Sequence, residues 1–155
     1  MPLQLPTIPD MTKRLGPLVL PDKSLYYSGP GPSSYTPRAR IYAQRYNLKT
    51  VMDYGDPAVV ELATNAGDIY VKEYWRRMSA AFSYATKGRA YVMLPGEPTL
   101  GVDWFKGTLW DTIEWPILEQ NSAVQEILRL APTGAPPESG INIKPIWTNP
   151  PRGLQ

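Results

Sequence analysis

The sequence predicts an α/β domain, with a small, mostly parallel sheet of about four strands, flanking helices and an abbreviated helical N-terminal part. Short apolar runs bounded by Gly and Pro alternate with segments of helical periodicity. At 155 residues, 43% of them hydrophobic, the chain is long enough for one core and too short for two full domains. We therefore expect one domain over 1–155, divided into a proline-rich arm (1–23), a helical part with a pocket strand (24–67) and an α/β core (68–150).

The N-terminal segments alternate between extended and helical patterns. Prolines at positions 2, 6, 9, 17 and 21 indicate an extended arm, in which 18–20 is a candidate edge strand. A strand is expected at 24–27, then a Gly/Pro/Ser-rich loop and a helix with Thr36 as N-cap and Pro37 at its first position. This loop is either an anion cradle or a plain connection. Residues 48–52 form the next strand candidate, and Asp56 and Pro57 begin a helix that Gly67 ends.

The C-terminal segments carry the sharper patterns. Apolar side chains at helical spacing from Val71 to Ala85 predict an amphipathic helix, which Gly88 stops. A buried strand is expected at 89–94, and the alternation at 108–115 predicts another strand with Glu114 on the same face as Trp110. Ser-x-x-Gln at 122–125 predicts a helix through 130. The segment 141–147, which contains Pro145, reads as a last, edge strand.

Composition excludes several classes of function. The chain has no His and no Cys, which removes Ser-His-Asp and Cys-His catalysis, disulfides and ordinary zinc sites. Sixteen basic residues against fourteen acidic ones are dispersed, so we expect no nucleic-acid partner. No apolar run is long enough to cross a membrane. We expect a cytoplasmic protein, with a secreted microbial enzyme or toxin as the alternative, and the oligomeric state stays open.

Four residues stand out by their pattern. Glu114 shares its predicted strand face with a tryptophan, which fits a cleft; an exposed face is the plainer interpretation. Trp75 and Ser79 lie one turn apart and share a side of their helix. A core tryptophan and a back-bonded helix serine are the plainer interpretations of that pair. Asp53 is either catalytic or holds a turn.

The spacing of these residues resembles the ADP-ribosyl cyclase/NAD glycohydrolase family. The matching residues are Trp75-x-x-x-Ser79-x-x-Phe82, then Val92-Met93-Leu94-x-Gly96, then Glu114 after a comparable loop. The resemblance covers residues 74–116 well and 24–54 loosely. It implies a catalytic Glu114 assisted by Trp75 and Ser79, with NAD as substrate and neither a cofactor nor a metal.

The looser part of the resemblance contains departures from the family. Tyr27 and Ser28 match a pocket tryptophan and serine, but Gly29 replaces the family's phosphate-binding arginine. Residues 50–53 match a Thr-Leu-Glu-Asp segment in which only Asp53 keeps its acidic residue, so the balance between cyclisation and hydrolysis stays open. The absence of cysteine points to a distant, microbial type of member. The expected substrate-binding residues are Tyr27, Ser28, Asp53, Arg76, Thr108 and Trp110.

The chemistry of NAD also suits this composition. The nicotinamide leaving group is already cationic, so it departs neutral without protonation, and one carboxylate is enough where ordinary glycosidases need two. Glu114 would stabilise the oxocarbenium-like state, while Trp75 and Trp110 stack on nicotinamide or wall the ribose. The products would be nicotinamide with ADP-ribose, cyclic ADP-ribose or both.

Two other functions stay open from the sequence. One is a nucleotide-active toxin module, namely a metal-independent ribonuclease that uses Glu114 with Arg76 or Arg77. Such enzymes usually need a general acid as well as a base, commonly His, which this chain lacks. The other is a non-enzymatic binding domain in which the tryptophans form a partner surface.

Overall fold

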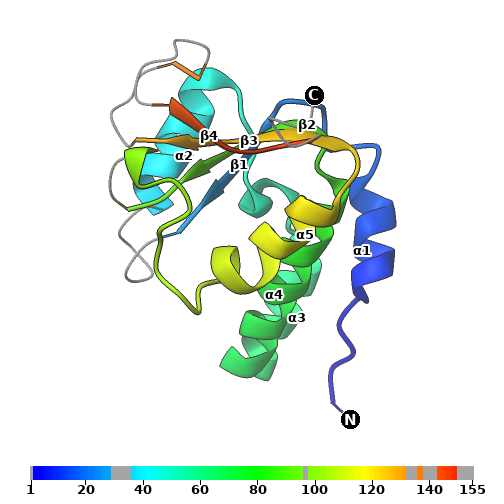
Figure 1. Ribbon diagram of the computed structural model, residues 1–155. Coiled ribbons are helices and arrows are strands. Elements are labelled where there is room, and N and C mark those ends of the chain that lie inside the picture. The colour runs from blue at the N-terminus through cyan, green and yellow to red at the C-terminus, as the bar shows by residue number, and fades with distance from the viewer. Residues whose placement is uncertain (1, 29–35, 96–97, 132–135, 138–142, 150–155) are drawn as a thin grey trace.

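The computed structural model describes residues 2–28, 36–95, 98–131, 136–137 and 143–149 (Figure 1). Its sheet has four strands in the order β1 (Ser24–Tyr27), β2 (Gly88–Met93), β3 (Val124–Leu130) and β4 (Ile143–Thr148). The first three strands are parallel, and β4 is antiparallel to β3. Helices cover both faces of this sheet, which confirms the predicted α/β class with a small, mostly parallel sheet.

Alternation along the strands sorts the core into two layers. Tyr26, Val92 and Ile127 face the layer that contains α1 (Ile8–Leu15), α4 (Asp68–Ala85) and α5 (Trp115–Gln120). Leu25 and Tyr91 face the opposite layer, which is built on α2 (Thr36–Tyr46). The register aligns the last residues of β1, β2 and β3, so their carboxyl ends meet at one edge of the sheet. Ligands of open α/β sheets bind at such an edge.

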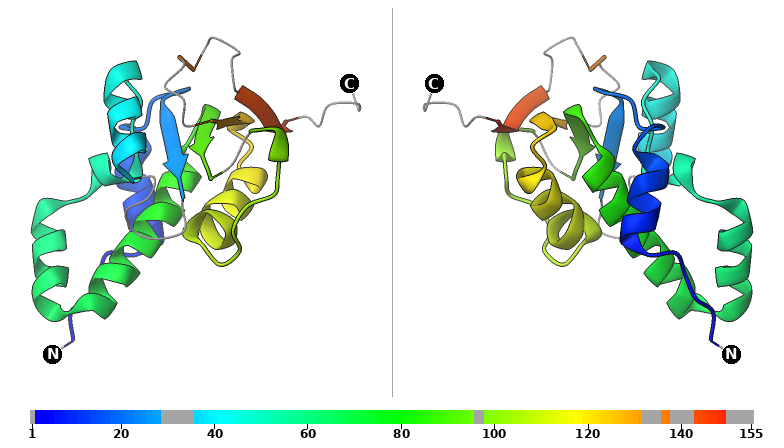
Figure 2. Two further views of the ribbon diagram at one scale, coloured as in Figure 1. Left: turned by 90° about the vertical axis from the view of Figure 1, so that its left-hand side faces the viewer. Right: turned by 90° about the vertical axis from the view of Figure 1, so that its right-hand side faces the viewer.

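The helix predicted between Pro57 and Gly67 and the helix predicted from Val71 to Ala85 are confirmed, the second with a start at Asp68. In α3 (Pro57–Ala66) the side chain of Asp56 accepts a hydrogen bond from the Ala58 N–H at 3.0 Å, which caps the first turn. Gly67, at φ 130°, then lets the chain reverse into α4, a conformation that costs other residues more. Figure 2 shows α3 and α4 as a hairpin whose tip points away from the sheet.

The prediction of an extended arm over 1–23 is wrong for residues 8–15. These residues form α1, in which Pro9 occupies the first turn, where a missing N–H breaks no helical bond. Thr7 caps the helix by accepting from the Asp10 N–H at 3.2 Å, and Met11 and Leu15 are buried against α4. Residues 18–20 form no strand. The strand expected at 48–52 is also wrong: only Lys49 bridges β1, and Val51–Tyr54 is a 3-10 helix.

Two predictions between 108 and 130 are wrong. A strand was predicted where the structure has a helix, and a helix was predicted where it has a strand. Residues 110–114 form a π-helix that continues into α5, because Thr108 Oγ1 accepts from the Asp111 N–H and begins a helical turn. Residues 124–130 form β3, which packs between β2 and β4. Asn121 starts a turn before β3 rather than a helix, because its Oδ1 accepts a hydrogen bond from the Ala123 N–H. Its Nδ2 donates to carbonyl oxygens at the end of α4, including that of Ser83.

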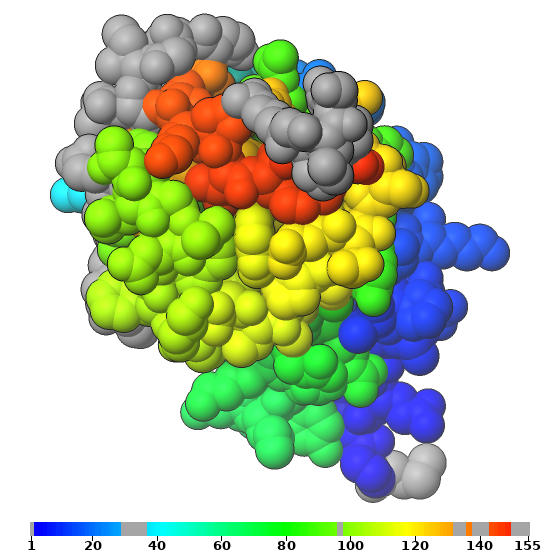
Figure 3. Space-filling model, viewed as in Figure 1, coloured from blue at the N-terminus to red at the C-terminus, as the bar shows by residue number. Residues whose placement is uncertain are grey.

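A buried arginine fixes the long connection between β2 and the π-helix. Arg129, on β3, has no exposed surface and donates to the carbonyl oxygens of Pro95, Gly101 and Asp103 at 2.6–2.9 Å. In the space-filling view of Figure 3, this connection and α5 cover the molecular face next to β4. The π-helix therefore starts from an anchored segment.

Candidate active site

A small pocket lies at the carboxyl end of β1. Its volume is about 140 Å³, and four segments of the chain meet there: β1, the 3-10 helix, α4 and the end of the π-helix. Its walls are mainly apolar and aromatic, with one carboxylate and one serine hydroxyl. The lining residues are Leu25, Tyr26, Tyr27, Val51, Met52, Trp75, Ser79, Phe82, Leu109 and Glu114.

Among the described lining residues, Glu114 has the single charge-bearing side chain. It is 5% exposed, and within the described residues no hydrogen bond or ion pair reaches its carboxylate. Burial therefore raises the pKa of Glu114 to about 8, because the ionised form loses hydration without gaining a partner. A carboxylate in that condition attracts a cation strongly.

The π-helix aims Glu114 into the pocket. The Trp115 N–H donates to the Trp110 carbonyl, five residues back, so the turn holds one residue more than an α-turn. Leu109 and Glu114 both line the pocket as a result, although a strand would have placed them on opposite faces. Single π-turns occur frequently at functional sites.

Helix α4 supplies Trp75, Ser79 and Phe82 from one side. Ser79 is 2% exposed, while Trp75 is partly exposed at the pocket wall. The indole lies over Gly55, where an added Cβ would come within 2.8 Å of the ring, and it makes an edge contact with Tyr74 at 5.1 Å between centroids. These contacts fix the orientation of Trp75.

Strand β1 brings both of its tyrosines to the pocket. Tyr27 was expected there, and Tyr26 was not. The Tyr26 hydroxyl and Thr86 Oγ1 are 2.6 Å apart, and burial raises the pKa of Tyr26 far above its ordinary value. Ser28 extends the strand through its N–H, which donates to the Met93 carbonyl at 3.2 Å, but it does not line the pocket.

Three other predicted site residues have structural contacts instead. Trp110 is 1% exposed and packs against Tyr26 and two further tryptophans, so it is a core residue beneath the pocket. Thr108 caps the turn that begins the π-helix. Asp53 accepts from the Thr50 N–H at 2.8 Å, which closes the 3-10 helix, as the turn interpretation expected.

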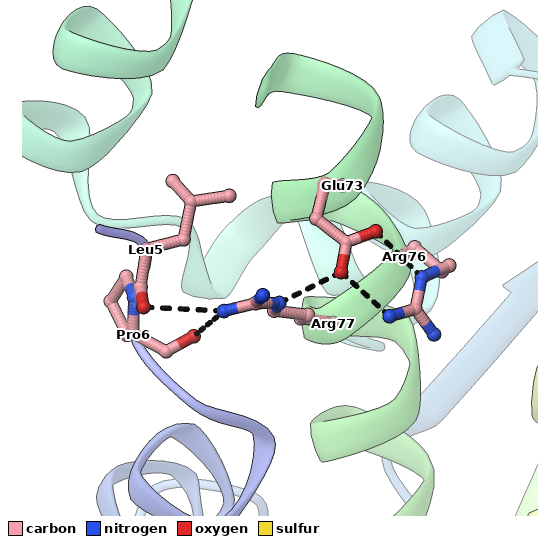
Figure 4. A network of polar contacts seen from close by, with 5 residues as sticks. All are labelled: Leu5, Pro6, Glu73, Arg76 and Arg77. Atoms are coloured by element: carbon pink, nitrogen blue, oxygen red, sulfur yellow. Dashed lines mark hydrogen bonds and ion pairs between the residues drawn. The ribbon is translucent and has the colours of Figure 1, made fainter. Parts of the chain in front are cut away.

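Arg76 and Arg77 are held by a neighbouring carboxylate. Glu73 accepts two hydrogen bonds from Arg76 and one from Arg77, and Arg77 also donates to the carbonyls of Leu5 and Pro6 (Figure 4). The Arg76 contact is the main reason that the pKa of Glu73 falls to about 2. Neither arginine lines the pocket, so the network ties the N-terminal segment to α4.

Reasoning from the sequence missed most of the apolar lining. Val51, Met52 and Leu109 depend on a 3-10 helix and a π-helix that the sequence pattern did not predict, whereas Tyr26 lies on the predicted strand β1. The Thr-x-x-Asp spacing at 108–111 was the available signal, because it is a helix-start pattern.

Metal-ligand clusters of three acidic, His or Cys residues are absent from the described part of the chain. Among the described helices, none has the length and apolar character needed to cross a bilayer.

Comparison with known proteins places the chain by its fold alone. No protein-family model and no curated protein matches it. A crystal structure of Aplysia cyclase complexed with substrate NGD and product cGDPR is similar, with a TM-score of 0.50 and 13% identity over 72% of this chain and 49% of that chain. An ADP ribosyl cyclase complexed with N1-cIDPR gives a TM-score of 0.49 at 12% identity over 72% and 50%. The chain thus spans about half the length of these proteins, and the first likeness shows a distant relationship in fold.

Proposed function

We propose that this protein cleaves the nicotinamide–ribose bond of NAD, releasing nicotinamide together with ADP-ribose, cyclic ADP-ribose or both. The observation that carries this proposal is Glu114, a buried carboxylate without a partner among the described residues, in an aromatic-walled pocket. A site of this kind favours a flat cationic group, and the nicotinamide ring of NAD is one. The distant likeness in fold to the Aplysia cyclase, which binds NGD and cGDPR, supports the same class of ligand.

The reaction that Glu114 would support needs a single carboxylate. The C–N bond between ribose and nicotinamide breaks, and its electron pair leaves with the ring, which becomes neutral. The ribose carbon is left as an oxocarbenium-like centre, whose positive charge the Glu114 carboxylate stabilises at short range in a dry pocket. Water then adds to that carbon and gives up a proton, forming ADP-ribose. Attack by an adenine nitrogen of the same molecule forms cyclic ADP-ribose instead.

The other pocket residues have distinct tasks in this mechanism. Trp75 would stack on the nicotinamide ring, since its indole forms a pocket wall and is held by Gly55 and Tyr74. Ser79 would hydrogen-bond a ribose hydroxyl. Tyr27 would close the opposite wall. None of these steps asks for a metal or a redox cofactor, because the leaving group is already activated.

Incubation with NAD followed by chromatography tests this proposal. Wild-type protein should release nicotinamide, and Glu114→Gln should reduce the rate by roughly 10²-fold or more, the scale of losing a principal transition-state stabiliser. Glu119→Gln is the matched control, because Glu119 lies on α5, close in sequence but outside the pocket. Circular dichroism would show that both variants are folded. No nicotinamide from the wild type, or equal rates in the two variants, would contradict the proposal.

A further inference from the structure

A second, larger pocket lies along the outer edge of β1. Its volume is about 400 Å³, and it lies between the C-terminal half of α2 and the segment 47–53. That segment runs beside β1, because Lys49 bridges Ser24 and the Lys49 carbonyl accepts from the Leu25 N–H at 2.8 Å. Figure 2 shows α2 on the side of the sheet where β1 lies. The lining residues are Arg40, Ala43, Gln44, Asn47, Leu48, Lys49, Thr50, Met52 and Asp53.

The two pockets share a wall. Met52 lines both of them, and it belongs to the 3-10 helix Val51–Tyr54 that separates them. Its side chain is 45% exposed, so it covers the boundary without sealing it. Thr50 and Asp53 hold this helix in place through the reciprocal capping contact. An elongated ligand that touches both pockets would have to pass over Met52.

The second pocket has the cations that the Glu114 pocket lacks. Among the described residues, no lysine or arginine lines the Glu114 pocket. Arg40 and Lys49 line the second one and are both exposed, and neither side chain forms a hydrogen bond or ion pair within the described part of the chain. Arg76 and Arg77, in contrast, are engaged by Glu73. Two uncommitted cations in one pocket are suited to a phosphate-bearing ligand.

We propose that the Arg40–Lys49 pocket binds the adenosine diphosphate half of the dinucleotide whose nicotinamide ring lies at Glu114. The position of the nicotinamide ring in this assignment rests on the proposed function, whereas the adenosine diphosphate site does not. At about 140 Å³ the Glu114 pocket is too small for a dinucleotide, whereas the two pockets together fall within the roughly 300–1,000 Å³ usual for such ligands. Met52 would lie under the middle of the ligand.

The polar lining matches the parts of an adenosine diphosphate. Arg40 and Lys49 pair with the phosphates, which carry the negative charge. The side-chain amides of Gln44 and Asn47 offer a donor and an acceptor each to the edge of the base. The Asp53 carboxylate, which already accepts from the Thr50 N–H, retains lone pairs for a ribose hydroxyl.

The test uses the full chain and two ligands that separate the pockets. ADP binding, measured by titration calorimetry, reports on the second pocket without any cleavage. Steady-state kinetics then compare NAD with nicotinamide riboside, which has the scissile bond but no phosphate. The variant is Arg40→Ala/Lys49→Ala, and Arg45→Ala is the matched control, because Arg45 is exposed on the same helix outside the pocket.

We expect the double variant to weaken ADP binding about tenfold or more, the scale of losing charge-assisted hydrogen bonds. Its kcat/KM should fall by a similar factor for NAD and stay unchanged for nicotinamide riboside, while the control matches the wild type. Equal losses for NAD and nicotinamide riboside would overturn the assignment, because they indicate a general distortion. ADP binding and NAD kinetics that match the control would overturn it too, with the proposed function intact. If NAD is not cleaved at all but ADP binding depends on Arg40 and Lys49, the proposed function fails and the nucleotide site stands.

Discussion

Replacing Glu114 with Gln should make the protein more stable at high pH. The ordinary pKa of 4.5 rises to about 8 in the folded state, so between these values the folded protein holds a proton that the unfolded chain has released. The free energy of unfolding therefore falls as the pH rises from about 4.5 to 8. At about 1.4 kcal/mol per pH unit, the full cost above pH 8 is at most roughly 5 kcal/mol. Gln carries no charge and escapes this cost.

Urea denaturation at about pH 5, 7 and 9 measures the effect. Glu114→Gln should differ little from the wild type at the lowest pH, where Glu114 is neutral, and should be several kcal/mol more stable at the highest. Glu61→Gln, on the exposed face of α3, controls for the general pH response of the protein. A difference between variant and wild type that stays constant across these pH values would refute the reasoning, because it would mean that the carboxylate has a compensating partner.

Four further outcomes are expected. kcat/KM for NAD should rise with pH up to about 8, because the free enzyme must lose the Glu114 proton before it can stabilise a cation; a flat profile of nicotinamide release would contradict this. Gly55→Ala should slow turnover about tenfold or more, since its Cβ would displace the Trp75 ring, and tryptophan fluorescence should change with it. Arg76→Ala should leave turnover intact and change stability by less than about 1 kcal/mol in thermal melts, because its ion pair is exposed; a large loss of turnover would return Arg76 to the site. Deleting Thr112 should abolish turnover, because the loss of one residue rotates Glu114 by about 100° relative to Trp110. A native circular dichroism spectrum of this variant would show that it is folded.

The sequence predicted the central helix and strand because two signals agreed there. The apolar spacing from Val71 to Ala85 covers most of α4, and Gly88, at φ 70°, is the first residue of β2 soon after this helix ends. Trp75 and Ser79 fell on the pocket side for the same reason, since a regular helix fixes which residues share a face. Long, regular segments therefore gave reliable positions.

The irregular turn that carries Glu114 could not be predicted from alternation. Trp110, Thr112 and Glu114 alternate like a strand, but the Thr108 cap and the five-residue turn make the segment helical. The prediction still placed Trp110 near Glu114, although on the wrong kind of element. A π-turn depends on tertiary packing, here the burial of Trp110 among other aromatic rings, and has no sequence period of its own.

Burial on both faces explains the error at β3. A strand inside a parallel sheet is apolar on both sides, so the spacing of Val124, Ile127 and Leu128 also fits one face of a helix. The Ser-x-x-Gln pattern at 122–125 then completed a false helix start. Asn121, whose amide joins the turn to the end of α4, decided the outcome through contacts that lie more than thirty residues apart in the chain.

The raised pKa of Glu114 and the proposed cationic substrate are thermodynamically linked. A nicotinamide ring beside Glu114 restores favourable interactions that the carboxylate lost on burial, so the cationic ligand binds more tightly to the ionised protein. By reciprocity, binding must lower the pKa of Glu114 by the same free energy and release a proton near neutral pH. A neutral analogue of the ring gains nothing from ionisation and releases no proton. The unfavourable free energy of burying the ionised Glu114 carboxylate is therefore offset only by binding of a ligand that is positively charged.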